Sequence, residues 1–133
     1  MKNLSKFIFT LEEYYNRGNA KGKLGDHTGA IQDYNKAIQL NPDFAEAYYN
    51  RGLAKGKLGD YTGAIQDYNK TIQLNPNDAK AYINRGNAKN KLGNYTEAIQ
   101  DYNKAIQLNP DFAKAYYSRG IAKYDLGNYT EAI

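Results

Sequence analysis

A repeat of 34 residues constrains the fold of this 133-residue chain more than any other feature of its sequence. The tripeptide Asn-Arg-Gly recurs at this step, with Ser replacing Asn in the last copy, and its glycines are Gly18, Gly52, Gly86 and Gly120. Leu-Asn-Pro recurs at the same step and contains all three prolines. A fixed period of this length is typical of stacked supersecondary units. We therefore divide the chain into a segment 1–10, three complete repeats and an incomplete one, with bounds 11–44, 45–78, 79–112 and 113–133.

Each complete repeat is predicted to form two helices, here illustrated for the second repeat. Asp43 followed by Glu46 indicates the N-terminus of the first helix, in the pattern of a capping box. This helix is expected to end near Leu58, because Gly59 can adopt the left-handed backbone that terminates helices. The second helix starts after Asp60 and is expected to run to about Asn75, since the following proline disfavours helical geometry in the residue before it.

Small and apolar residues recur near the helical period in both helices of the second repeat. The predicted buried stripe of the second helix comprises Ala64, Ile65, Tyr68, Thr71, Ile72 and Leu74. The first helix is expected to face it with Tyr48, Gly52, Ala54 and Leu58. The small residues Gly52 and Ala64 would let the two helix axes approach closely. Each helix pair retains apolar surface that only the next repeat can cover, so the sequence predicts a solenoid.

The repeat resembles the tetratricopeptide repeat, in which a large residue, Gly, Ala, an aromatic residue, Ala and Pro occupy fixed offsets. In the first repeat these are Tyr14, Gly18, Ala30, Tyr34, Ala37 and Pro42. In the third they are Tyr82, Gly86, Ala98, Tyr102, Ala105 and Pro110, and the second repeat departs from the pattern only by Thr71. The resemblance covers 11–133. It implies an all-α, right-handed superhelical solenoid of antiparallel helix pairs whose concave face is lined by the first helix of each repeat.

The resemblance also implies a function, which is a protein–protein interaction scaffold that is not an enzyme. Members of the family usually hold a peptide or protein segment in the concave groove. The groove positions that it implies here are Tyr15, Asn16, Asn19, Lys23, Tyr49, Asn50, Leu53, Lys57, Lys80, Ile83, Asn84, Asn87, Lys91, Lys114, Tyr117, Ser118 and Ile121. Asn can donate to and accept from a peptide backbone, and the lysines favour an acidic partner. The alternative is that these are ordinary solvated side chains of the repeat.

Some co-chaperone members of the family clamp a partner's C-terminal carboxylate with Lys, Asn, Asn, Lys and Arg. In register with that pattern, the two Asn slots hold Asn19 and Asn50, and the second Lys slot holds Lys80. Tyr15 replaces the first Lys and Asn84 replaces the Arg. The clamp is therefore incomplete, which disfavours chaperone tails as partners.

All four arginines of the chain occupy the slot before the first-helix glycine, where the family commonly has Leu. Lysines stand four residues later in the same repeats, at Lys21, Lys55, Lys89 and Lys123. Aspartates recur beside the second-helix tyrosine, and a guanidinium fork suits a carboxylate. We predict the structural ion pairs Arg17 with Asp33, Arg51 with Asp67 and Arg85 with Asp101. The alternative is that the arginines point outward and bind phosphate or carboxylate.

Several classes of chemistry are not expected. The chain has no cysteine, which excludes disulfides and thiolate metal sites. The only histidine, His27, stands where later repeats have Tyr61 and Tyr95, so it is expected to act as an aromatic substitute. We predict no catalytic residues, metal or cofactor. No apolar run approaches membrane-spanning length and no export signal is recognised, so a cytoplasmic protein with no membrane contact is expected.

Two other functions remain open at this point. The net charge of +4 and the 14 tyrosines would suit an RNA-binding helical repeat, although the Gly/Ala/Pro signature favours protein binding. The chain could also be an architectural or self-assembling module. The given sequence stops at Ile133, early in the second helix of the fourth repeat. The apolar side of the first helix of that repeat is therefore expected to be uncovered. Either the chain is a fragment of a longer repeat protein, or a second copy covers this surface. At the other end, Phe7 and Phe9 are predicted to cap the first repeat.

Overall fold

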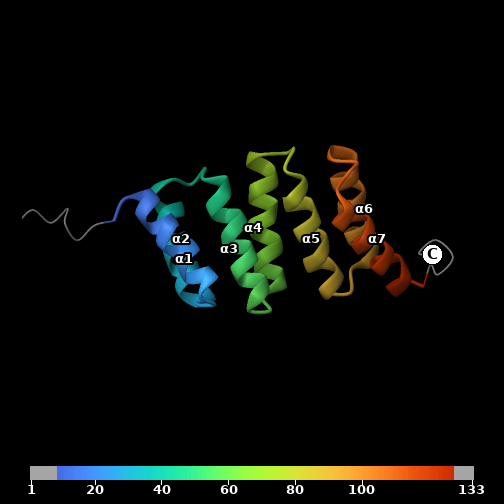
Figure 1. Ribbon diagram of the computed structural model, residues 1–133, viewed down its shortest axis with the longest axis horizontal. Helices are drawn as coiled ribbons and strands as arrows, with labels where there is room; N and C mark the ends of the chain where they lie inside the picture. The colour runs from blue at the N-terminus through green and yellow to red at the C-terminus, as the bar shows by residue number, and fades with distance from the viewer. Residues whose placement is uncertain (1–8, 128–133) are drawn as a thin grey trace, which may run out of the picture.

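Seven α-helices stand side by side in one row in the computed structural model, which describes residues 9–127 (Figure 1). Their bounds are α1 (Leu11–Lys23), α2 (His27–Leu40), α3 (Ala45–Lys57), α4 (Tyr61–Leu74), α5 (Ala79–Lys91), α6 (Tyr95–Leu108) and α7 (Ala113–Asp125). Each helix packs against the next one along the chain, and residues 9–127 contain no strand. The predicted all-α solenoid of stacked helix pairs is therefore confirmed.

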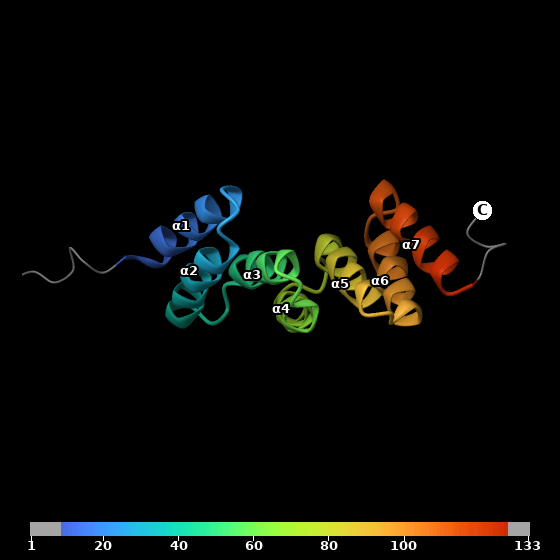
Figure 2. The ribbon, with the colours of Figure 1, turned by 90° about the horizontal axis from the view of Figure 1, so that it is seen from below.

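The odd-numbered helices lie together on one side of the row, which we call the inner face. Figure 2 shows α1, α3, α5 and α7 along this side, with α1 and α7 standing higher than α3, so that the row is concave. Each odd-numbered helix also contacts the next odd-numbered one. The inner face is consequently a continuous surface that crosses all four repeats.

Helix starts and ends follow local chemistry. The carboxylates of Asp26 and Asp60 each accept a hydrogen bond of 2.9 Å from the backbone N–H three residues on, which caps α2 and α4. At the ends of the first helices, Gly25, Gly59 and Gly93 have φ between 83° and 85°, the left-handed region that favours glycine. The turns therefore form where the sequence predicted them.

The predicted cap at Asp43 is wrong. The N-cap of α3 is Phe44, and no side chain caps this helix. The side chain of Asn41 accepts a hydrogen bond of 3.0 Å from the backbone N–H of Asp43, which holds Asp43 in the turn and moves the helix start one residue on. In the third repeat the aspartate stands one position later, and Asp78 does cap α5.

Leu58 is also placed differently from the prediction. The helix α3 ends at Lys57, Leu58 is its C-cap, and its side chain is 53% exposed rather than packed on α4. The second helix ends at Leu74, one residue before the predicted Asn75. Because Leu58 follows the last helical residue of α3, the helical period no longer sets the direction of its side chain.

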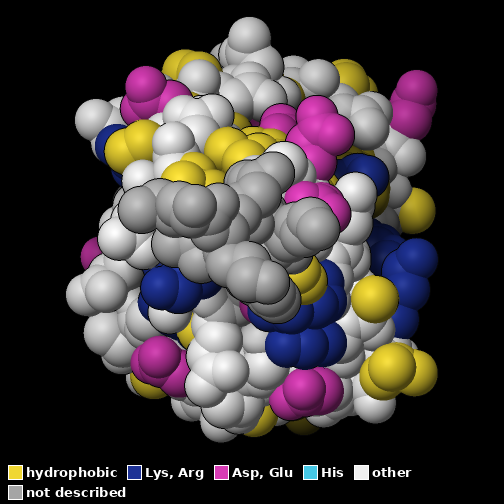
Figure 3. All heavy atoms as spheres, turned by 90° about the vertical axis from the view of Figure 1, so that its left-hand side faces the viewer, with side chains coloured by type: hydrophobic (Ala, Val, Ile, Leu, Met, Phe, Trp, Pro, Cys, Tyr) yellow, Lys and Arg dark blue, Asp and Glu magenta, His cyan; other side chains and the backbone are white. Residues whose placement is uncertain are grey.

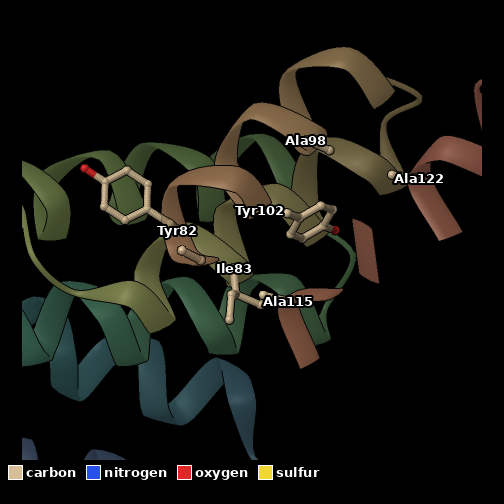
Figure 4. Packing of buried hydrophobic residues seen from close by; sticks show 7 residues of the cluster. Tyr82, Ile83, Ala98, Tyr102, Ala115 and Ala122 are labelled. Carbon is tan, nitrogen blue, oxygen red and sulfur yellow. The ribbon is translucent and has the colours of Figure 1, made fainter. Parts of the chain in front are cut away.

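The core of each repeat is an aromatic ring packed against a glycine. A Cβ atom added to Gly18, Gly52 or Gly86 would lie 2.8 Å from a ring carbon of Tyr34, Tyr68 or Tyr102, respectively. Alanines complete the core, and Figure 4 shows Tyr102 among Ile83, Ala98, Ala115 and Ala122 where α5, α6 and α7 meet. The close approach of the two helices in each pair therefore depends on the missing side chain.

An aromatic side chain packs on the first helix of the described region, whereas the last helix exposes large apolar side chains. At the start, the ring of Phe9 lies 5.2 Å from that of Tyr14 and 4.4 Å from the guanidinium carbon of Arg17. The predicted contact of Phe7 lies outside the described residues. At the other end, α7 exposes large apolar side chains, with Tyr117 73% exposed. The part of the fourth repeat that would follow α7 lies outside the described residues.

Candidate peptide-binding groove

The inner face is hollowed between successive repeats, and two hollows occupy equivalent places. The first, called socket 1, has a volume of about 420 Å³ and lies between α1, α2 and α3. Its apolar walls are Gly22, Ala30, Tyr34, Leu53 and Ala54. The second, called socket 2, has a volume of about 250 Å³ and lies one repeat further on, with walls Leu53, Gly56, Ala64, Tyr68 and Ala88.

A second row of hollows lies towards the beginning of the odd-numbered helices. One, of about 490 Å³, is lined by Tyr49, Lys80, Asn84, Lys114 and Tyr117 among others. A smaller one, of about 120 Å³, lies beside Tyr15 and also includes Glu46 and Asp78. Charge in this row is therefore mixed, whereas the sockets have no acidic lining residue.

Most predicted groove residues line one of these hollows. Three predicted residues are placed differently. Asn16 is exposed on α1 and lines none of the hollows described above. Ile83 borders the largest hollow but is only 4% exposed, because it packs in the core cluster with Tyr102 and Ala115. Ile121, on α7, is 40% exposed and also lines none of these hollows.

Three lysines mark the rim of the sockets. Lys23 and Lys57 line socket 1, Lys57 and Lys91 line socket 2, and all three are exposed. None of the ion pairs formed within residues 9–127 involves them. Their spacing of one repeat produces a row of unneutralised positive charges along the inner face.

Lysines and arginines do not form a separate patch at the end of the molecule formed by α1 and α2. The end of the molecule at α1 and α2 shows Lys and Arg interspersed with Asp and Glu (Figure 3). The net charge of +4 therefore does not create a single basic surface at this end. The row of lysines is instead a local feature of the groove.

Asparagines on the inner face are held by tyrosines of neighbouring helices. The amide nitrogen of Asn50 donates to the hydroxyl of Tyr15 at 2.9 Å and to Oδ1 of Asn19 at 3.2 Å. That of Asn84 donates to the hydroxyl of Tyr49 at 2.7 Å. These bonds cross from one repeat to the next. They fix the orientation of the asparagine side chains.

Sequence reasoning missed these Tyr–Asn bonds, although the sequence contained a signal. A tyrosine and the asparagine 35 residues later form each bond, in the pairs Tyr15–Asn50 and Tyr49–Asn84. At the third such pair of positions both residues change, to Ile83 and Ser118. A search for paired changes at this offset would have found the contact.

Buried tyrosines anchor other groove asparagines. The hydroxyl of Tyr34 donates to Oδ1 of Asn19 at 2.6 Å, and that of Tyr102 donates to Asn87 at 2.7 Å. Burial raises the pKa of Tyr34 to about 12, because the phenolate would lose its hydration. The hydroxyl therefore remains a donor at neutral pH.

The structure brings together all three predicted Arg–Asp pairs. Each is bidentate, and the shorter contact is 2.7 Å for Arg17 and Asp33, 2.6 Å for Arg51 and Asp67, and 2.7 Å for the third pair. The hydrogen bond from Arg17 holds the pKa of Asp33 below its usual range. The carboxylates are buried in the seam between the two helices of each repeat.

Two further partners of these pairs were not predicted. A lysine four residues after each arginine contacts the second carboxylate oxygen, as Lys55 does with Asp67 at 3.2 Å. The arginine also reaches back to the preceding repeat, where Arg51 donates to Asn35 at 2.8 Å and Arg85 to Asn69 at 2.9 Å. The arginine thus joins adjacent repeats and is committed to the scaffold. Arg119 makes the equivalent bond to Asn103 at 2.9 Å.

The histidine, possible metal ligands and the apolar character of the helices were also compared with the predictions. His27 is the first residue of α2 and lines socket 1, in the place that Tyr61 takes in socket 2. Residues 9–127 contain no cluster of three His, Cys, Asp or Glu side chains suited to a metal ion. Among the helices of this region, none combines the length and the apolar character that crossing a membrane requires.

Solved structures similar to this one share its fold over most of the chain. The crystal structure of MamA superimposes with a TM-score of 0.91 at 31% identity, covering 97% of this chain and 75% of that one. The first TPR of Spaghetti (RPAP3), bound to the HSP90 peptide SRMEEVD, has a TM-score of 0.85 at 28% identity, covering 88% and 93%. The second TPR domain of human RPAP3, in complex with the HSP70 peptide SGPTIEEVD, has a TM-score of 0.80 at 31% identity, covering 83% and 92%.

Family-level comparison agrees with the fold. No protein with a curated description matches the chain. The family described as TPR repeat matches residues 18–59 and 86–127, and two families described as tetratricopeptide repeat match residues 45–78 and 67–100. Together with the repeat signature and the row of helix pairs, these matches show that the chain belongs to the tetratricopeptide repeat family.

Proposed function

We propose that this protein is an interaction module that binds an extended, acidic segment of a partner protein along its inner face. The observation that carries the proposal is the row formed by Lys23, Lys57 and Lys91. These side chains are exposed and take part in no ion pair within residues 9–127. They also border apolar sockets, where a bound carboxylate would be partly shielded from water and attracted more strongly.

The peptides bound by two similar TPR domains support an acidic partner. SRMEEVD and SGPTIEEVD each carry three acidic side chains, and they are the ligands of those proteins. In this chain the two clamp slots that depart from the family pattern hold Tyr15 and Asn84, and both side chains are engaged in bonds across the repeats. We therefore propose that the groove selects side-chain carboxylates within a segment rather than a terminal carboxylate.

A selection from a displayed library of random 12-residue peptides tests the proposal. The affinity of a selected peptide is then measured by fluorescence anisotropy for three proteins. These are the wild type, the groove variant Lys57→Glu/Lys91→Glu, and the control Lys36→Glu/Lys104→Glu. The control makes the same change of charge on α2 and α6, outside the hollows. We expect enrichment of Asp and Glu, and a loss of affinity of roughly 10- to 100-fold in the groove variant alone.

Amidating the C-terminus of the selected peptide should leave its affinity within about threefold, because the terminal carboxylate is not the recognised group. Selection of no peptide, or equal losses in the two charge variants, would contradict binding in the groove. Tight binding of a polyuridine oligonucleotide that the groove variant abolishes would favour the RNA alternative.

A further inference from the structure

The glycines within α1, α3 and α5 fall into two groups. Gly18, Gly52 and Gly86 are required by packing, because a Cβ atom there would lie 2.8 Å from a tyrosine ring. Gly22 and Gly56 lie on the same helices but meet no such obstacle. A Cβ atom at Gly56 would have nothing within 4 Å, and one at Gly22 would lie 4.0 Å from Ala30, which is ordinary contact.

Neither Gly22 nor Gly56 serves an evident need of the backbone. Both have helical geometry and neither has positive φ. Glycine weakens a helix relative to alanine, because it gives up more conformational freedom on folding. The fold therefore tolerates these two glycines without requiring them.

Both glycines are walls of the sockets. Gly22 lines socket 1 and Gly56 lines socket 2, at equivalent places one repeat apart. Alanine, leucine and tyrosine form the apolar part of the walls, two asparagines also line each socket, His27 lines socket 1, and lysines form the rim. A cavity of this kind suits an apolar side chain that is flanked by carboxylates.

The other two repeats show what a side chain does at this position. The third repeat has Asn90 there and the fourth has Tyr124. The amide oxygen Oδ1 of Asn90 is buried and has no hydrogen-bond partner within residues 9–127. Tyr124 is 59% exposed, whereas the buried oxygen of Asn90 places that side chain against the protein. By the same geometry, a side chain at position 22 or 56 would enter its socket.

We propose that Gly22 and Gly56 determine the specificity of the groove by holding open two sockets for apolar side chains of an acidic partner segment. This inference rests on the function proposed above and adds a second requirement to it. The lysines recognise the charge of the segment, and the sockets recognise apolar residues between the charges. An acidic segment without apolar side chains would bind weakly.

Filling the sockets tests this inference. The probe is a fluorescein-labelled peptide from the selection described above, and the test variant is Gly22→Leu/Gly56→Leu. The matched control, Gln39→Leu/Gln73→Leu, adds the same side chains at exposed positions of α2 and α4. We expect at least a 30-fold loss of affinity in the test variant and less than a twofold change in the control, with the helical circular dichroism of both retained.

A graded series keeps the test independent of folding. Gly22→Ala/Gly56→Ala should lose less affinity than Gly22→Asn/Gly56→Asn, which copies the third repeat, and the leucine variant should lose the most. If the leucine variant loses helicity, the asparagine variant provides the same comparison. Replacing the apolar residues of the probe by alanine should weaken its binding to the wild type. It should change its affinity for the Gly22→Leu/Gly56→Leu variant little, because the sockets are already filled there.

The outcomes separate the two proposals. If the lysine variant loses affinity while the filled sockets leave it unchanged, the role of the glycines is overturned and the proposed function stands. If the wild type selects no peptide, the proposed function itself fails. If peptides without apolar residues bind as tightly as the probe, the sockets are not recognition sites.

Discussion

Asp67 is almost completely buried in the seam of the second repeat, where two cations contact its two oxygens. Arg51 binds Oδ1 at 2.6 Å and Lys55 binds Oδ2 at 3.2 Å. Removing water from a carboxylate is costly, and the fork of Arg51 offsets that cost by making two hydrogen bonds. The charges at this position form a network in which the two cations are not equivalent.

We expect the replacement of Asp67 and the replacement of Arg51 to differ in their effect on stability. Asp67→Leu leaves Arg51 and Lys55 facing each other and should lower the free energy of unfolding by about 3–5 kcal/mol. Arg51→Leu leaves Asp67 with Lys55 and should cost about 1–3 kcal/mol. Urea denaturation of both variants and of the double variant measures these values. The double variant should cost less than the sum, by about 0.5–3 kcal/mol. Strict additivity would show that the pair is not coupled.

The buried hydroxyl of Tyr34 should make the free energy of unfolding depend on pH in the alkaline range. Its pKa is raised to about 12, whereas an unfolded tyrosine titrates near 10, so the folded chain retains the proton over this interval. The contribution of Tyr34 to stability is therefore complete below about pH 10 and is lost as the pH rises towards 12. The slope for one group is at most about 1.4 kcal/mol per pH unit.

Comparing the wild type with Tyr34→Phe isolates this effect from the other groups that titrate at high pH. The variant should be less stable at pH 8, because it lacks the bond to Asn19. Its free energy of unfolding should then fall less steeply between pH 10 and 12. Parallel curves for the two proteins, measured by urea denaturation, would show that Tyr34 is not protected from ionisation.

Within a single helix, α3 combines two glycines with different roles. Gly52 packs against the ring of Tyr68, whereas Gly56 borders open space. We expect Gly52→Ala to destabilise the protein by about 1–3 kcal/mol, because the ring or the helix must move. Gly56→Ala should stabilise it by about 0.4–1 kcal/mol, because the unfolded chain loses freedom. Chemical denaturation of the two variants gives the comparison, and destabilisation by both would contradict the difference in packing.

The helices themselves were predictable to within about one residue at their ends. Gly59 and Asp60 mark a stop and a start whose chemistry is local, so the sequence placed that turn correctly. The start of α3 was misplaced because the side chain of Asn41 holds Asp43 in the preceding turn. Leu58 was assigned to the core because periodicity does not show where the last helical turn ends.

Over the whole molecule, the period of 34 residues determined the architecture, since each helix pair needs the next one to cover its apolar surface. Contacts within a repeat were predictable from residues that recur together, such as Arg51 and Asp67. Contacts between repeats were harder to predict, because a strictly repeated residue such as Arg51 does not show which neighbouring repeat it reaches, and only the paired change to Ile83 and Ser118 indicated the Tyr–Asn bonds. Sockets 1 and 2 were missed because a glycine in the sequence does not show whether the space beside it is filled.

If the inner face is the binding surface, a bound peptide should change the amide chemical shifts of its residues. We would record nitrogen–proton NMR spectra of the labelled protein with and without the selected peptide. We expect the shifted amides to belong to α1, α3 and α5, including Lys23, Lys57 and Lys91, while α2, α4 and α6 change little beyond the residues lining the sockets. Shifts concentrated on the outer surfaces of α2, α4 and α6, or on α7 alone, would contradict it.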